Sequence, residues 1–253
     1  MPIAYVPLNG FLCKFDRFEV CAWGYIERLK VIPDLSKFNS SISAEAWKEI
    51  NLNSIPYWLI ITELSEKCSL AEQINAILLS LWLARPYTIY AHYYFLHESD
   101  ESDKCATLDP FKIIVRRSQI KISEDDLDRS KGYLKQIQKI IETQGRLMDG
   151  LIFTLRGCVQ YDWKVAVICF STATEILMTY SRQPGLTKRL AEVFAFLTPK
   201  LPHSPEDAAT RFEALYNIRS KIVHGDKTIK KMNESFEQHL SNWATLLGEL
   251  WSA

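Results

Sequence analysis

Neither sign of charge is in excess in this sequence, since 30 Lys and Arg residues balance 30 Asp and Glu residues. A strong global basic field, which is common in nucleic-acid-binding proteins, is therefore missing. No run of eighteen apolar residues occurs, because polar residues such as Glu72, Gln73 and Glu175 interrupt the most apolar segments. We expect no membrane-spanning helix. The N-terminus has no basic region followed by an apolar run, so we also expect no signal peptide.

Cysteine pairs at metal-ligand spacing are also missing. None of the six cysteines forms a CxxC pair, and no histidine lies at a matching spacing, so we expect no zinc and no other metal site. Cys158 and Cys169 lie among apolar residues, as small core residues do. Scattered thiols in a chain of this size indicate a reducing compartment, and we expect a cytoplasmic protein. Without a Gly-rich phosphate loop or a GxSxG motif, no cofactor is predicted.

What is present is the composition of a globular protein, with 47% apolar and 24% charged residues. Residues 1–122 predict a mixed α/β region with strands within 11–23, 55–61, 87–97 and 111–122, the first bounded by Gly10 and Gly24. Polar or acidic loops are expected at 34–43 and 98–104. A helix is predicted to start at Ser69, which forms a capping box with Glu72, and to end at Pro86.

From residue 123 onward the pattern is helical. Ser123 and Asp126 cap a helix to about residue 143, a segment with Gly145, Gly150 and Gly157 follows, and a strongly apolar central helix is expected over 162–181. Further helices are predicted at 186–197 and 229–250. The last has a heptad-like apolar stripe for packing on the bundle or on a second copy of the chain. The predicted fold class is mainly α: a helical bundle at 123–253 preceded by the mixed region 1–122.

The most informative stretch is residues 204–225. Ser204 is a good N-cap, Pro205 suits the first helical position, and Asp207 completes a start resembling a capping box. Apolar residues recur at three- and four-residue steps, which predicts one buried face, and Gly225 can end the helix in the left-handed conformation. The buried face would consist of Phe212, Leu215, Ile218 and Ile222.

This helix places Arg219 in its last turns and His224 at its end. Imidazole can give or take a proton near neutral pH, and guanidinium can neutralise charge on a phosphate, so the pair suits phosphodiester cleavage. The two positions lie about 140° apart around a helix. They reach one substrate atom if Arg219 reaches round, if the helix loosens, or if a second subunit completes the site. The alternative is structural, with His224 acting only as a cap.

Basic residues gather near the same helix end, where Lys221, Lys227, Lys230 and Lys231 join Arg219 against Asp226 alone. Such a patch suits a phosphate ligand, but a solvated face is the commoner meaning of such a run. In the apolar central helix, Glu175 needs a partner because a lone buried carboxylate is costly. That partner is either any nearby Lys or Arg, or Arg219 itself.

Three segments together resemble the HEPN family, in particular its Apea-like branch. Residues 215–225, Leu-Tyr-Asn-Ile-Arg-Ser-Lys-Ile-Val-His-Gly, resemble the family's signature. Residues 171–177, Ser-Thr-Ala-Thr-Glu-Ile-Leu, resemble its central helix with an acidic residue. Residues 185–191, Gly-Leu-Thr-Lys-Arg-Leu-Ala, resemble the start of the next helix. Their order and separation fit as well, and the resemblance covers about residues 130–253.

The resemblance implies a dimeric helical bundle and a metal-independent endoribonuclease with an Arg-x(4–6)-His motif, which Arg219 and His224 match. His224 would act as general acid or base, Arg219 would stabilise the phosphate, and Ser220 would orient one of them where many active members have Asn, Asp or His. Lys221 and Lys227 would bind flanking phosphates, and Glu175 would support Arg219. The expected partners are RNA, a twin subunit and, in an antiviral or toxin setting, a larger defence complex. The alternatives are a non-catalytic nucleotide-binding, RNA-binding or dimerisation module, or a sensor subunit.

Overall fold

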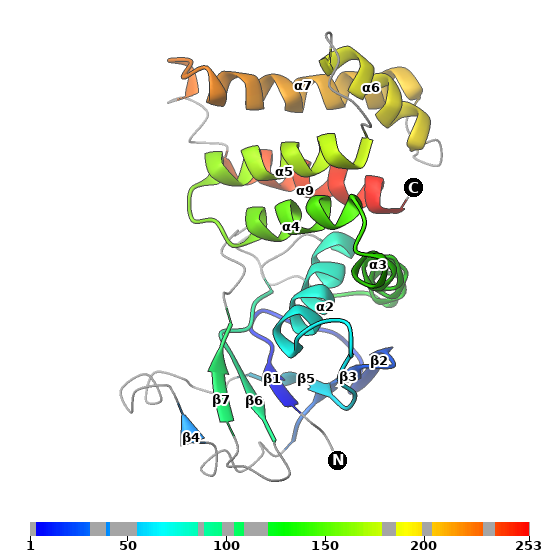
Figure 1. Cartoon of the computed structure of the whole chain (residues 1–253), viewed down its shortest axis with the longest axis vertical. Helices are drawn as coiled ribbons and strands as arrows, with labels where there is room; N and C mark the ends of the chain where they lie inside the picture. Colours follow the sequence, from blue (N-terminus) through cyan, green and yellow to red (C-terminus); the bar gives the residue numbers. More distant parts are fainter. Residues whose placement is uncertain are drawn as a thin grey trace.

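The computed structural model describes residues 4–30, 39–40, 55–85, 89–97, 104–108, 121–178, 186–198, 204–229 and 236–252. In these residues the chain is mostly helical, with a small sheet in its N-terminal part (Figure 1). The strands are β1 (Ala4–Pro7), β2 (Arg17–Cys21), β3 (Gly24–Arg28), β4 (Asn39–Ser40), β5 (Tyr57–Ile61), β6 (Tyr93–Leu96) and β7 (Lys104–Thr107). The helices are α2 (Leu70–Ala84), α3 (Glu124–Thr143), α4 (Leu147–Cys158), α5 (Trp163–Met178), α6 (Leu186–Leu197), α7 (Pro205–Val223) and α9 (Phe236–Ser252).

The strands of the sheet follow the order β2-β3-β5-β1-β6-β7-β4. Neighbours are antiparallel except β4 and β7, which pair in parallel. All five residues of the central strand β5 are buried. Because side chains alternate along a strand, Leu59 and Ile61 join the main core, whereas Trp58 and Ile60 join a separate small cluster with Phe95.

Helix α2 connects the sheet to the helical layers, as Figure 1 shows. It begins with the predicted capping box between Ser69 and Glu72 and ends at Ala84, just before Pro86. Its buried residues pack against α3 and α9. One buried apolar cluster therefore extends from the strands through α2 to α9, across the predicted boundary at 122/123.

The remaining helices form layers above α2 and α3: α4, α5 and α9 come next, and α6 and α7 lie farthest from the sheet (Figure 1). The central helix of the bundle is α5, which packs against α4, α6, α7 and α9. Its Phe170 is fully buried and stacks on Trp82 of α2, with ring centroids 5.6 Å apart. No helix in the described part of the chain is both long and apolar enough to span a bilayer.

The predicted fold class is confirmed as a mostly helical chain with a small, mainly antiparallel sheet near its start. The caps at Ser69, Ser123 and Ser204 and the bounds of helix 186–197 are confirmed as well. In residues 89–97, the described part of the strand predicted within 87–97, the strand is β6, Tyr93–Leu96. The predicted strand residues 111–120, most of the loops at 34–43 and 98–104, and Met232 of the last predicted helix lie outside the described residues.

Gly24 was predicted to bound the strand region 11–23; β2 ends at Cys21, and Gly24 is the first residue of β3. A glycine is required there for a steric reason: a Cβ at this position would be 2.1 Å from the carbonyl oxygen of Ile60 on β5. Any larger residue would separate two hydrogen-bonded strands. Glycine here permits close strand pairing.

Gly157 gives a stability prediction. Its Cβ, if present, would lie 2.4 Å from the ring of Phe170, which is itself held against Trp82. Gly157→Ala should therefore destabilise the protein by about 1–3 kcal/mol through overpacking. Gly132→Ala is the matched control, because nothing lies within 4 Å of its added Cβ. It should stabilise α3 by up to about 1 kcal/mol. Thermal unfolding of both variants checks this, and equal melting temperatures would contradict it.

Candidate catalytic site at the end of helix α7

Helix α7 begins at Pro205, directly after the predicted N-cap Ser204. The Ser204 side chain accepts a hydrogen bond of 3.1 Å from the Asp207 backbone N–H, and Pro205 occupies the first turn. On the inner face Phe212, Leu215 and Tyr216 are buried. The Phe212 ring lies 5.6 Å from Phe194 of α6 and 5.8 Å from Tyr216. These contacts fix the position of the helix and of every side chain it carries.

The C-terminus of α7 is a Schellman motif. Asp226 N–H donates to Lys221 C=O at 3.0 Å, and Gly225 N–H donates to Ile222 C=O at 3.2 Å. Gly225 has the expected positive φ of 66°. His224 N–H still bonds Ser220 C=O at 3.0 Å. The helix is therefore regular up to His224, and it does not loosen to bring Arg219 and His224 together.

The His224 side chain is exposed at this rigid end, as are Lys221 and Lys227. Ser220 is half-buried. Asp226 accepts a hydrogen bond from the Thr228 backbone N–H at 2.8 Å, and this bond lowers the pKa of the Asp226 carboxyl. Lys230 and Lys231, the other members of the predicted basic patch, lie outside the described residues.

Arg219 lies on the opposite, inward side. Its Nη2 is 3.7 Å from Oε1 of Glu175 on α5, so the predicted Glu175–Arg219 pair is present. The two side chains keep 27% and 24% of their surface exposed. Arg219 Nε is buried and has no hydrogen-bond partner among the described residues. The guanidinium is thus held by Glu175, and the side chain as a whole keeps about a quarter of its surface exposed.

Tyr216 completes this inner cluster and was not predicted. Its hydroxyl donates a hydrogen bond to Glu175 Oε1, and its ring centroid lies 5.5 Å from the Arg219 guanidinium carbon. Burial, together with the Glu175 carboxylate, raises the pKa of Tyr216, so the phenol remains a hydrogen-bond donor. Its spacing of three residues from Arg219 was the available signal, since residues three apart share a helix face.

Within one chain, the structure does not bring the predicted residues to one point. Arg219, Glu175 and Tyr216 form the inner cluster, whereas His224, Lys221 and Lys227 lie on the exposed helix end, with Ser220 between them in sequence. Reaching round to His224 would cost Arg219 its contact with Glu175.

Other candidate residues have ordinary surroundings. His92 keeps much of its surface exposed and makes an edge contact with Tyr90 at 4.9 Å, and the partial desolvation of its ring lowers the pKa of the imidazole. The six cysteines are free, and no cluster of three or more metal-ligating side chains occurs among the described residues. Among the described residues, the end of α7 carries the exposed His224, Lys221 and Lys227 together.

No family model, curated protein or solved structure matches the chain. The resemblance to HEPN domains therefore rests on the three sequence segments and remains a hypothesis about this protein.

Proposed function

We propose that the chain is a cytoplasmic HEPN-type endoribonuclease that cuts RNA without a metal ion and acts as a homodimer. The observation that carries the proposal is the exposed His224 on a rigid helix end, five residues after an arginine held by a carboxylate. The HEPN resemblance supports an antiviral or toxin-like role. A larger defence complex is a possible setting.

The reaction would use the RNA's own 2′-hydroxyl as nucleophile. His224 takes the hydroxyl proton as the 2′-oxygen bonds to phosphorus, and the bond from phosphorus to the 5′-oxygen breaks. The protonated His224 then gives its proton to the leaving 5′-oxygen, leaving a 2′,3′-cyclic phosphate on the upstream fragment. Arg219 stabilises the crowded phosphate through its planar fork of donors. Ser220 orients one of these groups, and Lys221 and Lys227 bind flanking phosphates.

A second subunit would allow Arg219 of one chain and His224 of the other to contact the same substrate. Because α7 is regular through His224, the two residues lie about 140° apart around the helix, and Arg219 contacts Glu175 of its own chain. Helix α7 lies in the outermost layer of the molecule (Figure 1), and its outer face exposes Glu213, Ala214 and Asn217. These residues lie on the His224 side of the helix, so a two-fold contact that brings the partner's His224 to Arg219 would use the edge of α7 where the Arg219 side chain keeps 27% of its surface exposed.

One observation favours a non-catalytic RNA- or nucleotide-binding module instead. The Arg219 charge is partly neutralised by Glu175, which weakens its attraction for a phosphate. Such a module would bind RNA through Lys221 and Lys227 and would leave it intact. The endoribonuclease would therefore yield RNA fragments, whereas the binding module would yield none.

Product analysis tests the proposal. Purified protein is incubated with a 5′-labelled RNA in EDTA, and the fragment ends are examined. We expect cleavage in EDTA and upstream fragments whose cyclic ends must be opened before a phosphatase can release phosphate. A deoxyribose substitution at the cut nucleotide should abolish cleavage there, because it removes the nucleophile. Binding with no cleavage would favour the non-catalytic module, and cleavage within the substituted DNA linkage would contradict the mechanism.

A further inference from the structure

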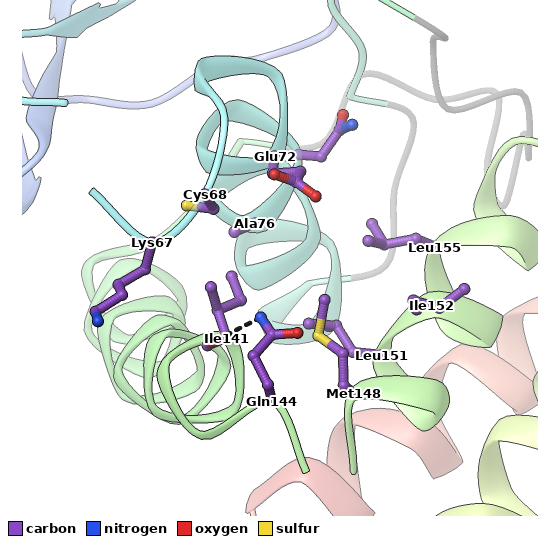
Figure 2. A pocket seen from close by; sticks show the side chains of 11 residues that line it. Lys67, Cys68, Glu72, Ala76, Ile141, Gln144, Met148, Leu151, Ile152 and Leu155 are labelled. Carbon is purple, nitrogen blue, oxygen red and sulfur yellow. Dashed lines mark hydrogen bonds between the residues drawn. The ribbon is translucent and has the colours of Figure 1, made fainter. Parts of the chain in front are cut away.

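A pocket of about 100 Å³ lies between α2 and α4, beside the turn that joins α3 to α4 (Figure 2). Helix α3 packs on α2 and α4 packs mainly on α5, so the two walls of the pocket belong to different packing layers. The turn at its base holds Gln144 in the left-handed conformation, with φ of 49°. This sharp turn leaves a gap beside the start of α4.

The walls of this pocket are mainly apolar. They combine one residue from α2, one from α3 and four from α4: Ala76, Ile141, Met148, Leu151, Ile152 and Leu155. Cys68 lies at the edge, and burial raises the pKa of its thiol, so the thiol is neutral. The Glu72 carboxylate at the rim is already engaged by the Ser69 N–H and hydroxyl, at 2.7 and 2.8 Å. The interior therefore favours an uncharged apolar group.

The amide of Gln144 gives the pocket a polar side. Asn75 also lines the pocket, but its Oδ1 is buried and does not face the open space. Gln144 donates from Nε2 to the Ile141 carbonyl at 2.7 Å, and its amide oxygen points toward Met148 in Figure 2. The Gln144 oxygen is an acceptor on an exposed side chain at the mouth of the pocket. A ligand that brings an O–H or N–H donor to it gains a hydrogen bond there.

We propose that this pocket binds a small neutral molecule with an aromatic or short branched apolar group and one hydrogen-bond donor. A cavity of about 150 Å³ lined by Leu, Ile and Phe is enough to bind benzene in another protein, so a pocket of this size that opens to solvent suits a single ring with its polar end at the mouth. The ligand would contact α2, before residue 122, and α4, after residue 123. The proposal does not depend on ribonuclease activity.

Methyl NMR of the full chain tests it. The sequence has four methionines, and Met148 lines the pocket whereas Met178 does not. With methionine methyl groups labelled, benzyl alcohol should shift the Met148 signal saturably, with a dissociation constant on the order of 1 mM, and leave Met178 unshifted. Toluene, which has the same ring and no donor, should bind about fivefold more weakly.

Three variants make the test decisive. Ile152→Phe fills the pocket from its half-buried wall and should abolish the shift, whereas Leu64→Phe adds similar bulk at an exposed site outside the pocket and should not. Gln144→Asn, which suits the left-handed backbone at this position and withdraws the amide from the pocket, should remove the preference for benzyl alcohol over toluene while retaining toluene binding. The proposal is overturned if benzyl alcohol gives no saturable Met148 shift, if Ile152→Phe leaves the shift unchanged, or if toluene binds the wild-type protein as well as benzyl alcohol does.

Discussion

His224→Ala is expected to lower the rate of RNA cleavage by about 10²–10⁴-fold, the usual contribution of a general acid or base. The side chain is exposed at the end of α7, and the Schellman bonds around it are made by backbone atoms. The substitution should therefore change the free energy of unfolding by less than about 0.5 kcal/mol. Cleavage rates under single-turnover conditions, with melting temperatures of the same preparations, provide the measurement.

The control for this variant is His92→Ala, which removes an exposed histidine from the N-terminal region. It should cleave RNA at the wild-type rate. RNA affinity of the His224→Ala protein should stay close to that of wild type, because Lys221 and Lys227 remain. If His224→Ala cleaves as fast as wild type, His224 serves only as the helix cap, and the ribonuclease proposal fails.

The parts of the fold that could be predicted from the sequence are those with local causes. A serine cap and its partner three residues later lie in one turn, so Ser69, Ser123 and Ser204 marked their helices without knowledge of the rest of the chain. The same holds for Gly225, whose positive φ ends α7. Local hydrogen-bonding chemistry decides these positions.

Strand pairing could not be predicted in this way. Strand β1 has four residues and pairs with β5 and β6, more than fifty residues later in the chain. Its Ala-Tyr-Val-Pro sequence shows no clear alternation, and β7, Lys-Cys-Ala-Thr, resembles a loop. Gly24 illustrates the same limit, because the carbonyl of Ile60 that requires a glycine lies on another strand. Such contacts exist only in the folded chain.

For the candidate site, the sequence indicated the motif residues but not their arrangement. The pairing of Arg219 with Glu175 was one of two predicted alternatives, and the structure contains it. The contribution of Tyr216 was missed, since a tyrosine on the inner face of a helix is usually a core residue. Whether Arg219 and His224 share a substrate depends on a second chain, which a single sequence does not describe.

Mixing two inactive variants should restore cleavage, which is the strongest test of a shared site. Arg219→Ala is expected to lower the rate by about 10²–10³-fold, because the developing charge on the phosphate loses its stabiliser. In a two-fold dimer whose sites take Arg219 from one chain and His224 from the other, a mixed dimer of Arg219→Ala and His224→Ala retains one complete site. Random exchange makes roughly half of the dimers mixed, so about a quarter of wild-type activity should return.

The control is a mixture in which both chains carry Arg219→Ala, and it should stay inactive after the same exchange procedure. A second control pairs His224→Ala with the double variant Arg219→Ala/His224→Ala, which leaves no complete site in any dimer. Recovery in the first mixture alone requires the two residues to act across the subunit interface, as the regular end of α7 and the Arg219–Glu175 contact lead us to expect. If cleavage does not return although mixed dimers form, each site belongs to one chain, and Arg219 must leave Glu175 to reach the phosphate.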